Sequence, residues 1–143
     1  MRKTEEKMSK AFFYWFPVLL WAFVIFLFSA NPTTRASEIH WQDFIVKKTA
    51  HIVEYGIFTL LLFRALRGAN LNMSKAVVSA IIISIIYGAT DEFHQSFTPG
   101  REPTLRDVIF DSIGSLLSGY FIFYLLPKMS NDVKRYAKRL QIV

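Results

Sequence analysis

The chain has 143 residues, of which 52% are hydrophobic and 20% charged, and its formal net charge is +6. This composition is typical of a small integral membrane protein, and we expect a single domain over residues 1–143. The sequence contains no cysteine. Disulfide bonds and thiol chemistry are therefore excluded.

The first predicted element is a helix over residues 11–30, a stretch without a single charge. About 20 helical residues cross a bilayer core, so this stretch is long enough to span the membrane. The basic residues before it also resemble the start of a signal peptide. However, the apolar run is too long, and Phe28 stands where a cleavage site needs a small residue. We expect the segment to remain a membrane helix.

Three further apolar stretches follow at residues 44–66, 75–97 and 105–126, and each carries charge toward one end only. The sequence therefore predicts an all-α integral membrane bundle of four transmembrane helices. A basic tail follows at residues 127–143. Its lysines and arginines lie beside Tyr136 and Leu140, as in a short helix on a membrane surface.

Lysine and arginine are distributed unevenly between the two ends of this bundle. One end holds most of the 17 basic residues: Arg2, Lys3, Lys7, Lys10, Arg64, Arg67, Lys75, Lys128, Lys134, Arg135, Lys138 and Arg139. The other end holds Arg35, Lys47, Lys48, Arg101 and Arg106. Because cytoplasmic connections are enriched in basic residues, both termini are expected to be cytoplasmic.

The charged ends of the second, third and fourth helices then share the extracellular side. They also enter the span, because the uncharged residues 76–90 of the third helix rise only about 22 Å, less than the bilayer core of about 30 Å. Ionisable groups at membrane depth usually mark function.

Helical spacing sorts these polar residues into one face on each helix. The three faces are Lys47, His51, Glu54 and Tyr55; Tyr87, Asp91, His94 and Gln95; and Asp107, Asp111, Gly114 and Ser118. The small residues of the last face allow a neighbouring helix to approach closely. We expect the three faces to meet in one shared site.

Several roles are open for this site. The charges could only lock the helices together as an ion-pair network. Alternatively, a buried carboxylate could act with a histidine in acid–base chemistry. The candidate catalytic residues are Glu54, Asp91, Glu92, His94, Asp107 and Asp111.

A divalent metal site is a further alternative, because helix bundles assemble metal ligands from i, i+3 pairs. The weak candidate ligands are His51, Glu54, Asp91, His94 and Asp111. The positive charges of Lys47 and Lys48 beside them do not favour a bound cation.

Other functions find less support in the sequence. It contains no phosphate-binding loop, nucleophile elbow or dinucleotide fingerprint. Nucleic acid is not an expected partner, because the basic residues flank membrane helices and match anionic lipid. A transporter is less expected, because four helices would form only a thin wall around a transport pathway and no inverted repeat is visible in the sequence.

The polar residues also carry a family resemblance. The run Asp-Glu-Phe-His-Gln-Ser-Phe-Thr-Pro-Gly-Arg at residues 91–101, followed by Asp107 and by Asp-Ser-Ile-Gly at residues 111–114, resembles the signature of the VanZ-like family. Lys48, His51 and Tyr55 with the following glycine match earlier positions of that signature. The resemblance covers roughly residues 47–119.

The resemblance implies a multi-pass protein of the bacterial cytoplasmic membrane, in a family linked to resistance to the glycopeptide teicoplanin. It implies a cell-envelope context without a reaction. The leading hypothesis is an outward-facing polar pocket that engages a membrane lipid, a lipid-linked envelope molecule or teicoplanin. The expected ligand-binding residues are Lys47, Lys48, His51, Tyr55, Gln95 and Arg101. The alternative is a membrane-embedded enzyme that modifies an envelope lipid or a cell-wall precursor.

Overall fold

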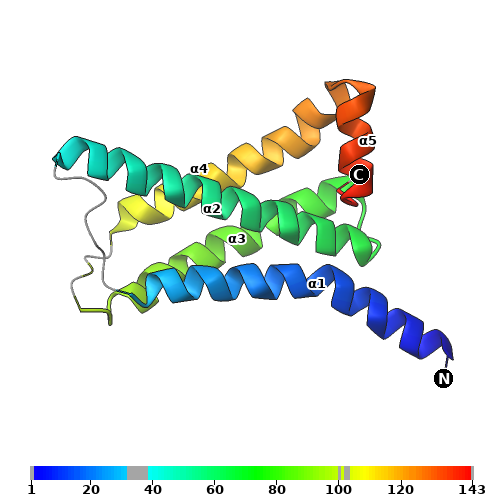
Figure 1. Cartoon of the computed structure of the whole chain (residues 1–143), viewed down its shortest axis with the longest axis horizontal. Helices are drawn as coiled ribbons and strands as arrows, with labels where there is room; N and C mark the ends of the chain where they lie inside the picture. The colour runs from blue at the N-terminus through cyan, green and yellow to red at the C-terminus, as the bar shows by residue number, and fades with distance from the viewer. Residues whose placement is uncertain (1, 32–38, 100, 102–103, 143) are drawn as a thin grey trace.

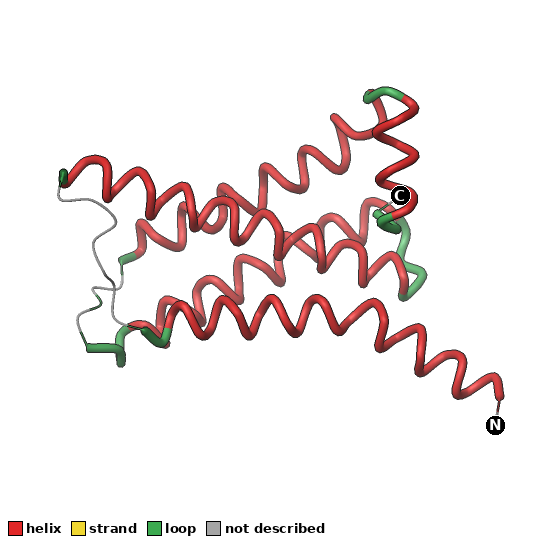
Figure 2. Tube along the Cα trace, viewed as in Figure 1, coloured by secondary structure: helices red, strands yellow, loops and turns green. Residues whose placement is uncertain are grey.

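A computed structural model of the chain describes residues 2–31, 39–99, 101 and 104–142. Every regular element within these ranges is helical (Figures 1 and 2). They are α1 (Arg2–Ser29), α2 (His40–Gly68), α3 (Met73–Gln95), α4 (Leu105–Tyr120), the π-helical η1 (Phe121–Leu125), the 3-10 helix η2 (Leu126–Lys128) and α5 (Asn131–Arg139). The predicted all-α class is confirmed.

Four helical segments in the described chain are long and apolar enough to cross a membrane: Lys10–Ser29, His40–Gly68, Met73–Gln95 and Leu105–Lys128. The four predicted spans are thus confirmed to within a few residues. Helix α1 begins earlier than expected, at Arg2, because the lysines and glutamates before the span are good helix formers. Figure 1 shows α1 bending in its N-terminal half. The helix contains Pro17, which removes a backbone donor and is a usual cause of a kink.

A tight turn joins α2 to α3. Asn70 adopts the left-handed conformation with φ of 66°, and the amide of Leu71 reaches back to the carbonyl of Leu66 at 3.2 Å. Asparagine tolerates this conformation better than most residues. The side chain of Asn72 then caps α3 by accepting a hydrogen bond from the amide of Lys75 at 2.9 Å. The turn fixes α2 and α3 as antiparallel neighbours.

Helices α2 and α3 form the centre of the bundle, with α1 packed on them at one side and α4 at the other. Figure 1 shows both chain termini at one end of the bundle, here named the terminal end. The opposite end, here named the loop end, holds the last turns of α1 and α3 and the first turns of α2 and α4. The assignment of the terminal end to the cytoplasm stays a prediction.

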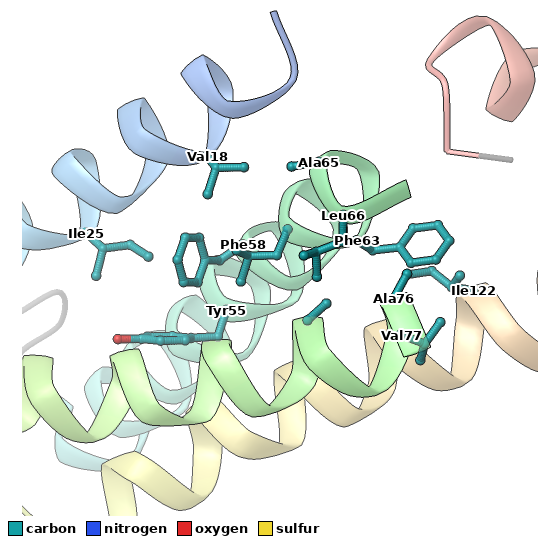
Figure 3. Close-up of a cluster of buried hydrophobic side chains, with 12 residues drawn as sticks. Val18, Ile25, Tyr55, Phe58, Phe63, Ala65, Leu66, Ala76, Val77 and Ile122 are labelled. Carbon is teal, nitrogen blue, oxygen red and sulfur yellow. The ribbon is translucent and has the colours of Figure 1, made fainter. Parts of the chain in front are cut away.

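The hydrophobic core lies mainly between α1, α2 and α3 (Figure 3). Ala65, Ala76 and Ala80 have no exposed surface, and their small side chains allow neighbouring helices to pack closely. Many large apolar side chains face outward instead, above all along α1, as expected for helices whose outer surface meets lipid. Tyr55 belongs to this core, and its hydroxyl points away from the side chains of Phe63, Ala76 and Val77 (Figure 3).

Helices α2 and α4 touch through their backbones at Gly114. A Cβ atom at this position would lie 2.2 Å from the carbonyl oxygen of Ile52. On the facing helix, Gly56 lies beside the same contact, because its Cβ would be 3.5 Å from the carbonyl oxygen of Gly114. This close approach sets the distance across which the polar side chains of α2 and α4 meet.

Candidate functional site

A set of polar side chains, here named the polar cluster, lies among α2, α3, α4 and the segment before α4. Its members are Lys48, His51, Glu54, Tyr55, Asp91, Glu92, Gln95, Arg101, Thr104, Asp107 and Asp111. Two residues named in the sequence arguments, Arg35 and Gly100, lie outside the described residues.

An ion pair and a histidine–aspartate hydrogen bond link α2 to α4, one helical turn apart. Lys48 Nζ donates to Asp107 Oδ1, and His51 Nδ1 lies 2.8 Å from Asp111 Oδ1. Asp111 is only 1% exposed, so its charge depends on this partner. Breaking a buried pair by removing one member typically costs about 3–5 kcal/mol. The two pairs therefore hold α2 and α4 in register.

Helix α3 approaches the His51–Asp111 pair through Gly88. A Cβ atom on Gly88 would lie 3.2 Å from both Asp111 Oδ2 and Tyr55 Cε1, tighter than an ordinary van der Waals contact. The missing side chain lets Tyr55 from α2 and Asp111 from α4 pack directly against α3. The Tyr55 hydroxyl is buried and has no hydrogen-bond partner among the described residues.

Arg101 ties the segment after α3 to the end of α1. Its Nε donates to the carbonyl of Asn31 at 3.1 Å, and a terminal nitrogen donates to the carbonyl of Phe28. The other terminal nitrogen donates to Gln95 Oε1 at 3.1 Å. Gln95 in turn donates to Asp91 Oδ2 at 2.9 Å. A chain of hydrogen bonds thus runs from α1 to a buried carboxylate of α3.

Glu92 faces the start of α4. Its Oε1 accepts a hydrogen bond from the amide of Thr104, which is the residue before the first turn of α4. The second oxygen, Oε2, is buried and lacks a hydrogen-bond partner within the described chain, as does the hydroxyl oxygen of Thr104. An unsatisfied buried group of this kind usually costs about 1–3 kcal/mol and calls for an explanation.

Glu54 lies on α2, one turn from His51, and is half-buried. Its backbone carbonyl accepts a hydrogen bond from the Trp21 indole at 3.0 Å, but its carboxylate makes no ion pair or hydrogen bond with any residue described. The charges that act on this carboxylate include His51, Asp91 and Asp111. The side chains that come together from the three predicted faces are His51, Glu54 and Tyr55 of α2, Asp91 of α3 and Asp111 of α4. Tyr87 of the α3 face instead donates to the carbonyl of Ala22 in α1 at 2.7 Å.

Two of the predicted site residues make their contacts outside this meeting point. Lys47 pairs with Asp43 of its own helix at 2.8 Å. His94 faces α1, where Nδ1 lies 3.5 Å from Ser29 Oγ and the ring lies against Phe26 at a centroid distance of 4.6 Å. Neither contacts the His51–Asp111 pair.

The pairing of His51 defines what the cluster can do chemically. A carboxylate at Nδ1 orients the imidazole and leaves Nε2 as the nitrogen that can exchange a proton, and Nε2 has no hydrogen-bond partner in the described part of the chain. The same residues are less suited to a metal. No group of three or more His, Cys, Asp or Glu side chains among the described residues is arranged to hold a metal ion.

Several residues that build this region are absent from the predicted polar faces. Ser84 and Ser115 form a buried hydroxyl pair at 2.8 Å between α3 and α4, and Ser115 also donates to the carbonyl of Asp111 at 3.0 Å. Gly88 and Thr104 were not singled out either. Ser84 and Gly88 are four residues apart, as are Asp111 and Ser115, so small-residue spacing was the signal that could have found them.

Four helices that are long and apolar enough to cross a membrane, with paired and unsatisfied polar side chains between them, define the class: a small multi-pass membrane protein with a polar cluster inside its helix bundle. The VanZ/LLP1 family model matches residues 12–127. The chain therefore belongs to the VanZ/LLP1 family, and the resemblance drawn from residues 47–119 is confirmed over a wider range. No curated protein and no solved structure matches the chain at a significant level.

Proposed function

We propose that this VanZ family protein binds the polar head of an amphiphilic envelope molecule in its polar cluster. The ligand would be a membrane lipid, a lipid-linked cell-wall precursor or a lipoglycopeptide such as teicoplanin. The loop end would face the outside of the bacterial cytoplasmic membrane, where cell-wall precursors and glycopeptides meet. Family membership supplies the link to teicoplanin resistance, and the chemistry of the cluster supports binding.

The observation that supports this proposal is the set of polar groups left without partners inside the helix bundle. Tyr55 OH and Glu92 Oε2 are buried and unsatisfied within the described residues, and the Glu54 carboxylate makes no ion pair or hydrogen bond with any described residue. Lipid cannot satisfy such groups, and each unsatisfied group costs several kcal/mol in a hydrocarbon environment. A ligand that supplies hydrogen bonds there would recover that free energy.

The unsatisfied groups also indicate which kind of head group would fit. Two are carboxylates, which only accept hydrogen bonds when ionised, so the ligand would present donors such as sugar hydroxyls, amides or amines. The three basic residues among the expected ligand-binding residues are already engaged: Lys48 by Asp107, Lys47 by Asp43 and Arg101 by backbone carbonyls. A donor-rich head therefore fits better than an anionic one.

A hydrophobic chain on the ligand would lie along the lipid-facing surface of the helices. Ile109 and Ile113 of α4 and Ile86 of α3 are exposed apolar side chains on the helices that supply the cluster. Teicoplanin carries a fatty acyl chain and vancomycin does not, so a site open to the membrane would favour teicoplanin.

The test is teicoplanin and vancomycin susceptibility of a Gram-positive host that expresses the native chain or a variant at equal membrane levels. The variants are Glu54→Gln, Glu92→Gln and Asp111→Asn, and Asp132→Asn is the control, because Asp132 is exposed on α5. We expect protection against teicoplanin from the native chain and the control, and its loss in the three variants. Equal protection by all four variants, or equal protection against both drugs, would contradict the proposal.

An enzyme is the second candidate, and the His51–Asp111 pair favours it. A histidine oriented by a buried aspartate, with an unpaired Glu54 carboxylate nearby, is an arrangement suited to proton transfer. An enzyme would leave a covalently altered lipid or precursor in cells. Mass spectrometry of envelope lipids from cells with the native chain or His51→Gln separates the two candidates, because binding alone leaves every lipid mass unchanged.

A further inference from the structure

A second candidate binding site lies at the terminal end of the bundle, remote from the polar cluster. A cavity of about 520 Å³ opens there between the start of the first span, the α2–α3 turn and the C-terminal segment. The residues that line it are Lys10, Phe13, Tyr14, Arg67, Gly68, Asn70 and Gln141. Its volume falls in the range of about 300–1,000 Å³ that is usual for small-molecule sites.

The lining is basic and contains no acidic residue among those described. Lys10 makes no ion pair or hydrogen bond with any described residue. Arg67 donates one hydrogen bond to the carbonyl of Leu71 at 2.6 Å, which leaves further guanidinium donors. Asn70 and Gln141 add amide groups. Two cations with amide donors and no carboxylate match the oxygens of a phosphate group.

Packed side chains build the walls of this cavity. The ring of Tyr14 lies directly on Gly68, where a Cβ atom would come within 2.6 Å of it. The guanidinium of Arg64 stacks on Tyr14 at 5.0 Å and on Phe13 at 4.8 Å from the ring centroids. Arg64 also binds the C-terminal segment, donating to the carbonyl of Leu140 at 3.0 Å. The C-terminal segment is thereby held as one wall.

The position of the cavity relative to the membrane indicates which kind of molecule would supply a phosphate group. Lys10 begins the first apolar span, and Gly68 ends the second. Both positions lie at the boundary between hydrocarbon and water, where the phosphates of membrane lipids are located. Phe13 is exposed and lies three residues after Lys10, inside the apolar span of α1. A lipid with its head in the cavity would keep its acyl chains beside α1.

We infer that this cavity binds a phosphate group, and that its source is the head group of an anionic phospholipid. Lys10 and Arg67 contact the phosphate oxygens, and the Tyr14 ring closes the side toward the bundle. The site is independent of the polar cluster and of the ligand proposed for it. An occupied cavity would join α1, the α2–α3 turn and the C-terminal segment.

The test is native mass spectrometry of the purified full-length chain in detergent, titrated with phosphatidylglycerol or phosphatidylcholine of identical acyl chains. Lys10→Gln combined with Arg67→Gln removes both cations of the cavity. Lys138→Gln combined with Arg139→Gln removes the same charges from α5, outside the lining. At roughly fivefold per basic residue, we expect the first pair of changes to weaken phosphatidylglycerol binding about 30-fold. The control pair should leave binding within about twofold.

Lys10→Gln alone provides a variant that removes no hydrogen bond among the described residues, so it should fold as the native chain does and lose about fivefold in affinity. Inorganic phosphate, added as a competitor, distinguishes a phospholipid head group from a soluble phosphate as the ligand of the cavity. Phosphatidylglycerol that stays bound in millimolar phosphate supports the lipid, whereas displacement supports the phosphate site with a soluble ligand. Equal binding of the two lipids by the native chain, or equal losses in the two double variants, would overturn the inference.

Discussion

Replacing Gly114 with alanine should separate α2 from α4 and disrupt the polar cluster at the same time. The new Cβ atom would lie 2.2 Å from the carbonyl oxygen of Ile52 and 2.9 Å from its carbonyl carbon. These are backbone atoms, so no change of rotamer relieves the contact. The two helices themselves must move.

The size of this movement follows from the contact distance. A carbon atom normally stays at least about 3.3 Å from a carbonyl oxygen, so the present 2.2 Å requires a separation of about 1.1 Å. The same movement would lengthen the 2.8 Å contact of His51 with Asp111 to about 3.9 Å, beyond hydrogen-bond range. Overpacking costs about 1–3 kcal/mol, and a lost hydrogen bond to a charged group about 1.5–3 kcal/mol. We expect the free energy of unfolding to fall by at least about 2.5 kcal/mol.

The assay is unfolding of the purified chain in mixed detergent micelles by titration with sodium dodecyl sulfate, followed by loss of helical circular dichroism. Gly56→Ala is the matched control, because its Cβ would meet the carbonyl oxygen of Gly114 at an ordinary 3.5 Å. It should leave the midpoint nearly unchanged. If Gly114→Ala proves as stable as Gly56→Ala, the close backbone contact between α2 and α4 does not exist as described.

Three further predictions concern Arg101, Ser84 and the orientation of the chain. Arg101→Lys keeps the charge but cannot make the same three hydrogen bonds, so the last turn of α1 should show faster amide hydrogen exchange. Unchanged exchange would count against the contact between Arg101 and α1. Ser84→Ala leaves Ser115 without its hydroxyl partner and should lower stability by about 0.6 kcal/mol in the same detergent titration. Because the chain lacks cysteine, single cysteines can map its orientation: an external reagent should label Thr98→Cys in intact cells and Asn70→Cys only after permeabilisation. The reverse pattern would move the polar cluster to the cytoplasmic side.

The helices themselves could be predicted because span length and apolar composition are local properties. A charge-free run of this length, such as residues 11–30, is expected to cross a bilayer as a single helix. The early start of α1 at Arg2 depends on the helix propensity of a polar segment, which hydropathy does not report. The π-helical segment η1 likewise has no signal in an apolar sequence.

Helical spacing predicted which residues of the candidate site share a face of one helix. Spacing placed His51, Glu54 and Tyr55 on one face of α2, and the structure brings that face to α3 and α4. The spacing of residues along one helix does not determine how that helix is rotated relative to its neighbours. Lys48 therefore reaches Asp107 while the adjacent Lys47 stays on its own helix.

His94 shows the same limit on α3. It shares a helical face with Asp91, three residues earlier, yet it lies against Phe26 of α1. A helix in the centre of a bundle has neighbours on several sides, so residues on one face can contact different partners. Which partner each residue meets depends on the crossing geometry of α1, α3 and α4, and no pattern within one helix encodes it.

The contacts at the end of α1 have a consequence for the order in which the chain is assembled in the membrane. The carbonyls of Phe28, Ser29 and Asn31 accept hydrogen bonds from Arg101 and Thr98, about 70 residues later in the chain. During synthesis α1 enters the bilayer long before these donors exist. These carbonyls therefore lack their side-chain donors until α3 and Arg101 have been synthesised. A nascent chain that stops short of Arg101 could still pack α1 against α2 through the Trp21 indole and the Glu54 carbonyl, but the end of α1 would lack its Arg101 donors.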